Sequence, residues 1–574
     1  MPERVWKALF ALLVLVFVAR IASTYRVFTN TIDENDHIEA GIEYFQRGVY
    51  EYEPQHPPLA RIVEAALPYF LADLRLTEAR IDNGKLVHKP IDEKKQRLET
   101  FLWGGMWREG SPEYYWRTLS LARAGNLVFG LLLLWVVYAW AAELFGRRTG
   151  AIAALLASCS PTILAHSGLA TLDAAAAATT AAASYAFWRW SRGPSLRSAA
   201  IAGAATAIAV TSKLSTVAFL PPIFLSLFLL ARRALARKQA LRELGAFLAV
   251  VATLIWAVYR FDFGPIGELD PTFAQSIGAS SDSWILTTPL PAPSFFQGLL
   301  DVAGHNEQGH SSYLLGEWSK EGRAAYFPVA LAVKTTLPLL ALAIWGFVAG
   351  WRSGKKNETL SAAAPIAAVM LIAVPANINI GIRHILPLFP SLAILAAIPF
   401  ARASFGLDKK NTAGIFAALL LVWHVGESVG AHPDYLPYFN QLGRGRETAV
   451  LLDSNLDWGQ DLARLGDWMQ HEGSPTTVIL RYFGEARADT FGINTYLLPP
   501  AHPDAGYFAV SANYLFGLEG SSDRLRALQN QEPLAKIGRS IFIFRIPPND
   551  VFQLAPPWFF ESYEELGKPV ENGE

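Results

Sequence analysis

Long apolar segments recur along the first three quarters of this chain, separated by shorter polar stretches. An uninterrupted apolar segment of about 18 residues is long enough to cross the hydrocarbon layer of a membrane as a helix. The sequence therefore predicts an α-helical polytopic membrane protein with about eleven spans. They lie near residues 6–23, 119–142, 149–166, 173–190, 198–212, 215–231, 243–259, 326–349, 360–376, 384–400 and 412–430. The fifth and sixth are short and meet at Lys213, so their boundaries stay open.

Basic residues mark one face of this bundle, because they fall in alternate connections between the apolar segments. They are Arg147, Arg148, Arg189, Arg192, Arg197, Arg232, Arg233, Arg237, Lys238, Arg242, Arg352, Lys355, Lys356, Lys409 and Lys410. By the positive-inside rule this face is cytoplasmic. Arg4 and Lys7 place the N-terminus on the same side, and an odd number of spans puts the C-terminus outside. The first segment could pass for a signal peptide, but no small-residue cleavage site follows it, so we expect a retained span of an inner or plasma membrane.

The long polar regions fall on the opposite, external face. Residues 24–118 form a large first loop, in which Ile62 to Leu71 predicts a helix lying at the membrane interface, and residues 260–325 form a second. Residues 1–431 are thus a transmembrane module. Residues 432–574 predict a small external α/β domain. Its expected strands are Ala449 to Leu452, Thr477 to Leu480, Tyr507 to Val510 and Ser540 to Phe544.

Composition narrows the classes of function. Of the 574 residues, 52% are hydrophobic and 17% charged, and a net charge of −1 gives no field that would attract nucleic acid. Cys159 is the single cysteine, which excludes an intramolecular disulfide and a cysteine-based zinc site. No HExxH spacing and no phosphate-binding glycine motif occurs. A divalent metal therefore has no support from the sequence, and nucleotide-dependent chemistry is disfavoured.

Acidic residues stand at the predicted external edge of two spans. Asp33 and Glu34 follow the first span, and Asp173 begins the fourth, a few residues after His166. Each could simply cap a helix start, Asp173 after Thr171. Carboxylates at hydrocarbon are costly, however, and both sets lie on the same predicted side, which capping does not require. We therefore take Asp33, Glu34 and Asp173 as candidates for chemistry, with His166 as a candidate for substrate binding.

Cationic candidates lie on the same predicted face. Arg383 and His384 stand at an external mouth between two spans, Lys213 lies at the tip of the fifth and sixth, and Arg61 follows His56-Pro57-Pro58. Arg383 could merely reach the interface with its guanidinium. Together, cations beside carboxylates suit an anionic headgroup, because guanidinium binds phosphate oxygens in a bidentate way. An external site can use a sugar that is delivered on a lipid phosphate. The lipid phosphate is then the leaving group, and its negative charge needs nearby cations, while the acceptor hydroxyl needs one carboxylate as a base.

Several motifs carry a resemblance to a known family. They are Asp33-Glu34, QHPPL at 55–59, Leu172-Asp173, GHSSYLLGEWS at 309–319, YFPVALAVKT at 326–335, IRHILPLFP at 382–390, HPDYLPYFN at 432–440 and DSNLDWGQDL at 453–462. In this order, over most of the chain, they resemble the GT-C superfamily of lipid-phosphate-sugar-dependent glycosyltransferases. The nearest resemblance is to bacterial relatives of the dolichyl-phosphate-mannose protein mannosyltransferases, glycosyltransferase family 39.

The resemblance implies a GT-C-like bundle and a role for each matched residue. Asp33 would be the base that deprotonates the acceptor, and Glu34 would orient it. Arg383 and His384 would contact the phosphate of a polyprenyl-phosphate-sugar donor, and Asp173 would bind sugar or acceptor. The family's mannosyltransferases carry a MIR-type domain in an external loop, for which this chain has no room, so the hydroxyl acceptor could be protein, lipid or glycan.

Other interpretations stay open at this stage. A secondary transporter would use Asp33, Asp173 and Arg383 to bind ions or substrate, but it predicts charges in mid-span and a repeat between halves, which the sequence lacks. A non-enzymatic membrane assembly protein leaves the acidic loop unexplained. We expect DSNLDWGQDL to be structural or to face the acceptor, with Asp457 and Asp461 four residues apart at a helix start.

Overall fold

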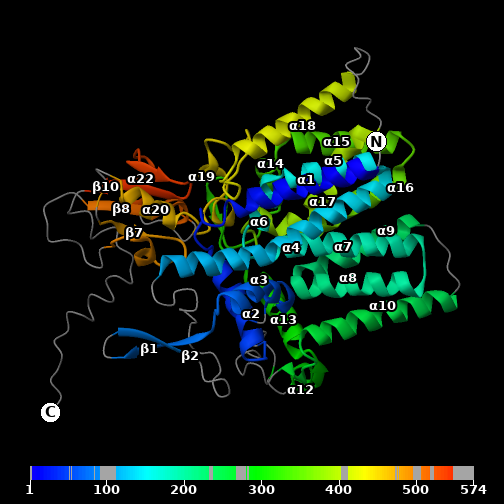
Figure 1. The fold of residues 1–574 in the computed structure, drawn as a ribbon, viewed down its shortest axis with the longest axis horizontal. Coiled ribbons are helices and arrows are strands. Elements are labelled where there is room, and N and C mark those ends of the chain that lie inside the picture. Colours follow the sequence, from blue (N-terminus) through cyan, green and yellow to red (C-terminus); the bar gives the residue numbers. More distant parts are fainter. Residues whose placement is uncertain are drawn as a thin grey trace.

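The structure is a computed structural model in which a helical bundle is joined to a small sheet domain. It describes residues 3–50, 52–53, 55–82, 85–90, 111–231, 237–266, 280, 283–401, 412–471, 475, 477–495, 506–517 and 523–546. Figure 1 shows the long helices lying side by side, with the strands of the sheet domain grouped beyond one end of the bundle and the N-terminus towards the other. The predicted fold class, a helical membrane bundle with a large first loop and a C-terminal α/β part, is confirmed.

Every predicted span corresponds to a helical segment. The bundle is built from α1 (Glu3–Ala22), α4 (Pro112–Phe145), α5 (Arg147–Ser158), α6 (Pro161–Ser167), α7 (Leu172–Arg192), α8 (Leu196–Ser212), α9 (Ser215–Ala231), α10 (Arg237–Val258), α14 (Tyr326–Lys334), α15 (Leu337–Arg352), α16 (Lys356–Ala373), η3 (Ile382–Leu388), α17 (Phe389–Ala397), η4 (Ile398–Ala401) and α18 (Thr412–Gly430). Within the described residues, five helices are long and apolar enough to cross a membrane, or up to seven if each bent pair is one span. Several spans are thus supported, whereas the count of eleven stays a prediction.

Two predicted spans are broken rather than straight. The segment predicted at 149–166 bends by 68° between α5 and α6, and the one at 326–349 bends by 109° between α14 and α15. Pro161 and Pro338 stand in the first turns of α6 and α15. Proline cannot donate the backbone hydrogen bond that would continue the preceding helix, so each break falls just before a proline.

Small residues allow the helices to approach closely. Ala174 to Ala178 of α7 are all buried. A Cβ placed at Gly203 of α8 would lie 2.7 Å from the carbonyl oxygen of Phe247 in α10, and one at Gly346 would lie 1.8 Å from that of Leu395. Helix pairs in membranes gain their packing energy from such close backbone contacts.

The first loop folds over the end of the bundle. It contains α2 (Ile32–Gln46), α3 (Pro58–Leu71) and an antiparallel hairpin of β1 (Thr77–Asp82) and β2 (Lys85–Pro90). Helix α3 includes the residues predicted as the interfacial helix, Ile62 to Leu71. It packs closely on α2, since a Cβ at Gly41 would lie 2.2 Å from the carbonyl oxygen of Arg61. Residues 91–110 of the first loop lie outside the described residues.

The second loop is a chain of short elements. These are β3 (Phe263–Pro265), α12 (Trp284–Thr287), β4 (Pro289–Pro291), α13 (Pro293–Gln308), β5 (Ser312–Leu314) and β6 (Glu317–Ser319). Strands β3 and β4 pair in an antiparallel way, as do β5 and β6. Asn377 donates from its side chain to the carbonyl oxygen of Asn306, and this contact ties the end of α13 to the segment before η3.

The C-terminal part contains a four-stranded sheet in the order β7-β8-β10-β9, in which only β7 and β8 are parallel. Its elements are α19 (Glu447–Val450), η5 (Asp453–Asn455), α20 (Leu462–Met469), β7 (Ile479–Arg481), η6 (Ala488–Phe491), β8 (Gly506–Ser511), α21 (Ala512–Phe516), α22 (Asp523–Gln529), β9 (Ala535–Ile537) and β10 (Ile541–Ile546).

Three of the four predicted strands are confirmed with shifted ends, as β7, β8 and β10. The strand predicted at 449–452 is wrong, because that segment begins as the short helix α19. Only Leu451 forms a bridge, to Leu314 of the second loop. Val450, Leu451 and Leu452 are buried, and the N–H of Leu315 donates to the carbonyl oxygen of Val450 at 3.0 Å, so this segment bonds the second loop instead of the sheet.

Candidate functional site

Helix α2 begins with an acidic pair whose two members do different things. Glu34 is fully buried and caps its own helix, accepting a hydrogen bond from the backbone N–H of Thr31 at 2.8 Å. Its two oxygens also accept from the guanidinium of Arg123 in α4, each at 2.8 Å, and Oε1 accepts from the N–H of Ala170 at 2.8 Å. Glu34 therefore joins the start of α2 to α4 and to the segment before α7.

Asp33, one residue earlier, faces a different partner. Its side chain is 27% exposed, and Oδ2 accepts from Nη1 of Arg383 at 2.5 Å. Arg383 comes from the first turn of η3 and is 9% exposed. The structure thus brings together the acidic first loop and the Arg-His motif, 350 residues apart in sequence.

Asp173 joins the same cluster from the first turn of α7. Its carboxylate is 1% exposed and lies 2.5 Å from Nζ of Lys213, 3.9 Å from Nη1 of Arg383 and 3.8 Å from Nδ1 of His166. Thr171 is the N-cap of α7, so the capping position belongs to the threonine. Two carboxylates and two cations from four separate elements therefore form one continuous charged cluster.

Two histidines beside this cluster keep ring nitrogens without a partner. Nε2 of His384 and Nδ1 of His166 are buried and have no hydrogen bond in the described part of the chain. The His384 ring lies near Phe327 of α14, with 6.5 Å between ring centroids. A buried unpaired nitrogen is costly, so a ligand that supplied the missing hydrogen bond would be stabilised here.

Arg61 and His56 are placed differently from Arg383. Arg61 is fully buried and its guanidinium donates to Nδ1 of His37 at 3.1 Å, to the hydroxyl of Tyr50 at 2.9 Å and to the carboxylate of Glu53. In this structure its donors are engaged within the first loop. The ring of His56 packs edge-on against His37. Burial and the charges of Arg61 and Lys213 lower the pKa of His56 well below its usual range, so it stays a neutral imidazole near the cluster.

The first half of the DSNLDWGQDL motif, residues 453–458, holds Arg383 in place. The backbone N–H of Ile382 donates to Oδ1 of Asn455 at 2.9 Å, and the hydroxyl of Ser454 donates to the carbonyl oxygen of Ile380 at 2.6 Å. The guanidinium of Arg383 lies over the ring of Trp458, 4.3 Å from its centroid. A cation stacked on an aromatic face is fixed in orientation as well as stabilised.

Asp457 and Asp461 of that motif bond neighbouring residues, and its helix begins later than predicted. Asp457 lies before α20, where its carboxylate accepts from the N–H groups of Gly459 and Asn513. Asp461 is the N-cap of α20 and accepts from the hydroxyl of Ser540 at 2.8 Å. Only Asp461 is therefore at the helix start.

A group of carboxylates lies near Asp33. Asp36 accepts from the hydroxyl of Tyr52 at 2.8 Å, and Glu485 accepts from the amide of Asn35 at 2.9 Å. Burial and the neighbouring charge of Glu53 raise the pKa of Asp36 to about 6. Burial and the charge of Asp36 raise the pKa of Glu485 to about 7. This group is acidic, in contrast to the cations Arg383 and Lys213.

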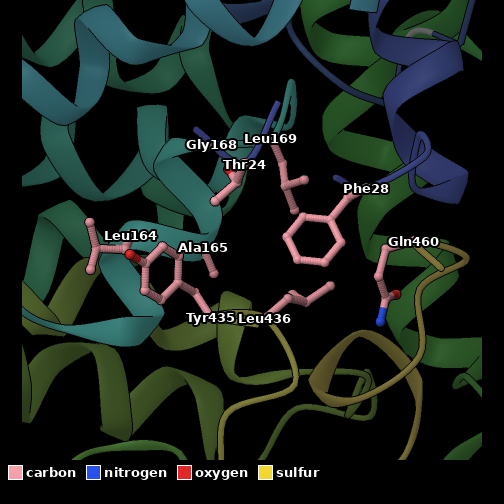
Figure 2. Close-up of a pocket in the computed structure, with 9 residues that line it drawn as sticks. All are labelled: Thr24, Phe28, Leu164, Ala165, Gly168, Leu169, Tyr435, Leu436 and Gln460. Atoms are coloured by element: carbon pink, nitrogen blue, oxygen red, sulfur yellow. The ribbon is translucent and has the colours of Figure 1, made fainter. Parts of the chain in front are cut away.

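Two further observations concern metal groups and a small cavity whose lining includes none of the four charged residues. Among the residues that the structure describes, no group of three or more histidine, cysteine, aspartate or glutamate side chains could hold a metal ion. Figure 2 shows a small cavity between the end of α1, α6 and the segment around Tyr435. Its volume is about 10 Å³, enough for about one water molecule and far too small for a sugar.

Comparison with known proteins supports the predicted resemblance. Residues 118–258 match the family described as dolichyl-phosphate-mannose-protein mannosyltransferase. Among solved structures, the S. cerevisiae protein O-mannosyltransferase Pmt1-Pmt2 complex bound to the sugar donor is similar over 87% of this chain and 94% of that chain, with a TM-score of 0.50 and 11% identity. This chain has the GT-C fold.

A second solved structure shares less of the backbone geometry. ArnT from Cupriavidus metallidurans bound to undecaprenyl phosphate is aligned over 97% of this chain and all of that chain, with 15% identity and a TM-score of 0.48. A comparison of the sequence with curated proteins finds no match. The chain resembles the mannosyltransferases in its fold and in the sequence of residues 118–258.

Proposed function

We propose that this GT-C protein is a membrane glycosyltransferase that moves a sugar from a polyprenyl-phosphate donor to a hydroxyl group on the external face. The observation that carries the proposal is the charged cluster of Asp33, Arg383, Asp173 and Lys213. It joins a partly exposed carboxylate, that of Asp33, with two cations at the ends of helices. These are the groups that a lipid-phosphate leaving group and a hydroxyl nucleophile require.

In this mechanism Asp33 is the base. The acceptor oxygen attacks the anomeric carbon as its proton passes to Asp33, and the bond from that carbon to the phosphate oxygen breaks with inversion. The polyprenyl phosphate leaves with one more negative charge than the donor carried. Arg383 and Lys213 stabilise that charge, and His384 donates a hydrogen bond to a phosphate oxygen through Nε2–H.

The pair of Arg383 and Asp33 bears on how the base becomes available. The guanidinium of Arg383 donates to the Asp33 carboxylate, with 2.5 Å between their atoms. A donor phosphate competes for the same guanidinium, so its arrival frees the Asp33 carboxylate for the acceptor. Asp173 holds Lys213 in place, and His166 supports Asp173 from α6. Glu34 orients Asp33 indirectly, by fixing the first turn of α2.

His56 and Arg61 have secondary roles in the proposal. Arg61 braces α3 against α2 through His37 and Tyr50, which keeps His56 beside the cluster. His56 then contributes to donor binding as a neutral ring rather than as a cation. The cytoplasmic N-terminus and the external C-terminal domain follow the distribution of basic residues, and the acceptor is a protein, lipid or glycan hydroxyl.

The transporter and assembly alternatives are less favoured by the geometry. Asp173, Lys213 and Arg383 all lie in the first turn of a helix or between two helices, not in mid-span. The test uses purified protein in liposomes, polyprenyl-phosphate mannose labelled in the sugar, and membranes of a strain lacking the protein as the source of acceptor. We expect transfer of label by the wild type. Labelled product that forms equally without the protein contradicts the proposal.

A further inference from the structure

Residues 453–458 lie between the sheet domain and η3 and are held from both sides. On the domain side, the backbone N–H of Asp453 donates to Oδ1 of Asn513 at 2.8 Å, and the Asn513 amide donates to the carbonyl oxygen of Asp457 at 2.9 Å. On the other side, Ser454 and Asn455 bond the backbone around Arg383. The C-terminal domain therefore supplies a wall of the charged site.

Asp453 is the strained member of this wall. Its φ is +57°, a conformation that side chains other than glycine adopt only at a cost, and it is 7% exposed. A strained backbone conformation persists only where surrounding contacts hold it, and residues with such conformations are common at functional sites. The bonds of Asn513, Ser454 and Asn455 are those surroundings, and their effect is to bury a carboxylate at the edge of the cluster.

Asp453 lies within the site because the next two residues, Ser454 and Asn455, bond the backbone beside Arg383. Arg383 and His310 lower its pKa and Asp33 raises it, against a larger rise caused by burial, with a net value of about 6. His310 comes from the second loop, where its ring stacks on His305. Asp453 thus lies within the fields of both the proposed phosphate ligand, Arg383, and the proposed base, Asp33. The sugar of the donor must lie between phosphate and base, because its anomeric carbon bonds to one and is attacked at the other.

We propose that Asp453 binds hydroxyl groups of the transferred sugar, so that the C-terminal domain forms the sugar-binding side of the site. The inference rests on the proposed lipid-phosphate donor. A carboxylate accepts strong hydrogen bonds from sugar hydroxyls, whereas its charge repels the phosphate. Asp453 is therefore a residue that recognises the sugar and contributes nothing to holding the bare carrier phosphate.

The test compares two ligands on the purified full-length protein in detergent. One is a short polyprenyl phosphate, and the other is the same phosphate carrying mannose, glucose or an aminopentose, whichever the wild type binds most tightly. For Asp453→Asn we expect the ratio of the two dissociation constants, sugar-bearing over bare, to rise about 10-fold or more, the loss typical of a charged hydrogen bond. Affinity for the bare phosphate should stay within about twofold or rise slightly.

Asp457→Asn is the matched control, because Asp457 is a buried carboxylate of the same motif that is held by the N–H groups of Gly459 and Asn513. It should leave the ratio unchanged even where it lowers the unfolding temperature. A ratio that Asp453→Asn leaves unchanged overturns the inference, as does an equal loss for both ligands with a lower unfolding temperature. A wild-type protein that binds neither ligand overturns the proposed donor itself, and the inference falls with it.

Discussion

Nη1 of Arg383 lies 2.5 Å from Oδ2 of Asp33 and 3.9 Å from Oδ2 of Asp173, so one guanidinium holds the carboxylates of two distant elements. Two contacts hold Arg383 in place. Asn455 accepts a hydrogen bond from the N–H of the preceding residue, Ile382, and the guanidinium of Arg383 lies over the ring of Trp458. Arg383, the residue proposed to bind the phosphate, is therefore held in one orientation. Its charge is paired with that of Asp33, the proposed base.

Replacing Arg383 tests the phosphate ligand. Arg383→Gln removes the cation that would pair with the carrier phosphate, so donor affinity should fall about 10- to 100-fold. Binding of a short polyprenyl phosphate to the purified protein measures this. Arg444→Gln is the control, because Arg444 is half-exposed and pairs with Glu427 away from the cluster. Unchanged donor affinity in Arg383→Gln would remove Arg383 from the donor site.

The Asp173–Lys213 pair predicts a recovery of stability without a recovery of activity. Asp173→Asn leaves Lys213 without its nearest countercharge in a mostly buried site, which should cost about 3–5 kcal/mol. The double variant Asp173→Asn with Lys213→Met removes both charges and should regain most of that stability, yet remain inactive. Unfolding temperatures in detergent and sugar transfer measure the two effects. An active double variant would show that Lys213 has no part in catalysis.

Glu34 should prove a positioning residue. Its bidentate pair with Arg123 is fully buried, so Glu34→Gln should destabilise the protein by about 3–5 kcal/mol. Glu427→Gln, at the partly exposed pair with Arg444, should cost about 1 kcal/mol or less. Unfolding temperature measures both. A Glu34→Gln protein as stable as the wild type but inactive would instead place Glu34 in the chemistry.

The sequence predicted which charged residues lie together better than it predicted the residues that hold them in place. Asp33, Asp173 and Arg383 could be grouped because each stands at a span end on one predicted face, and charged residues there are costly. The stacking of Trp458 on Arg383, and the bonds of Asn455, could not be foreseen. They depend on how the C-terminal domain docks on η3, and DSN after an apolar run is also ordinary turn chemistry.

The predicted role of Arg61 shows the same limit. Its position after a rigid proline pair and near the acidic loop favoured a phosphate contact. Which way its guanidinium points is decided by α3 packing on α2 at Gly41, which turns it towards His37, Tyr50 and Glu53. The bends at Pro161 and Pro338 were similarly hidden, because hydropathy stays high across both breaks.

The carboxylates beside Asp33 predict a pH dependence of stability. Because the folded-state pKa of Glu485 is raised from 4.5 to about 7, the folded protein retains a proton that the unfolded chain releases between these values. The free energy of unfolding should therefore fall as pH rises through this window. Glu485→Gln removes this contribution and should raise the unfolding temperature at pH 8 by about 2 °C or more.

The same measurement at pH 5 should show a much smaller difference between Glu485→Gln and the wild type, because Glu485 is then mostly protonated. Asp489→Asn is the control, since Asp489 is exposed and Arg487 lowers its pKa. Equal slopes of unfolding temperature against pH in wild type and Glu485→Gln would contradict the assigned pKa.

The central claim is that Asp33 takes the proton of the acceptor hydroxyl. The most direct measurement is the turnover of sugar transfer from labelled polyprenyl-phosphate sugar by Asp33→Asn, with binding of the short polyprenyl phosphate measured on the same preparation. We expect turnover to fall by a factor of about 10² to 10⁴, the usual contribution of a general base. Phosphate binding should be equal or tighter, because Arg383 loses its internal partner. Transfer at the wild-type rate by Asp33→Asn would contradict the account.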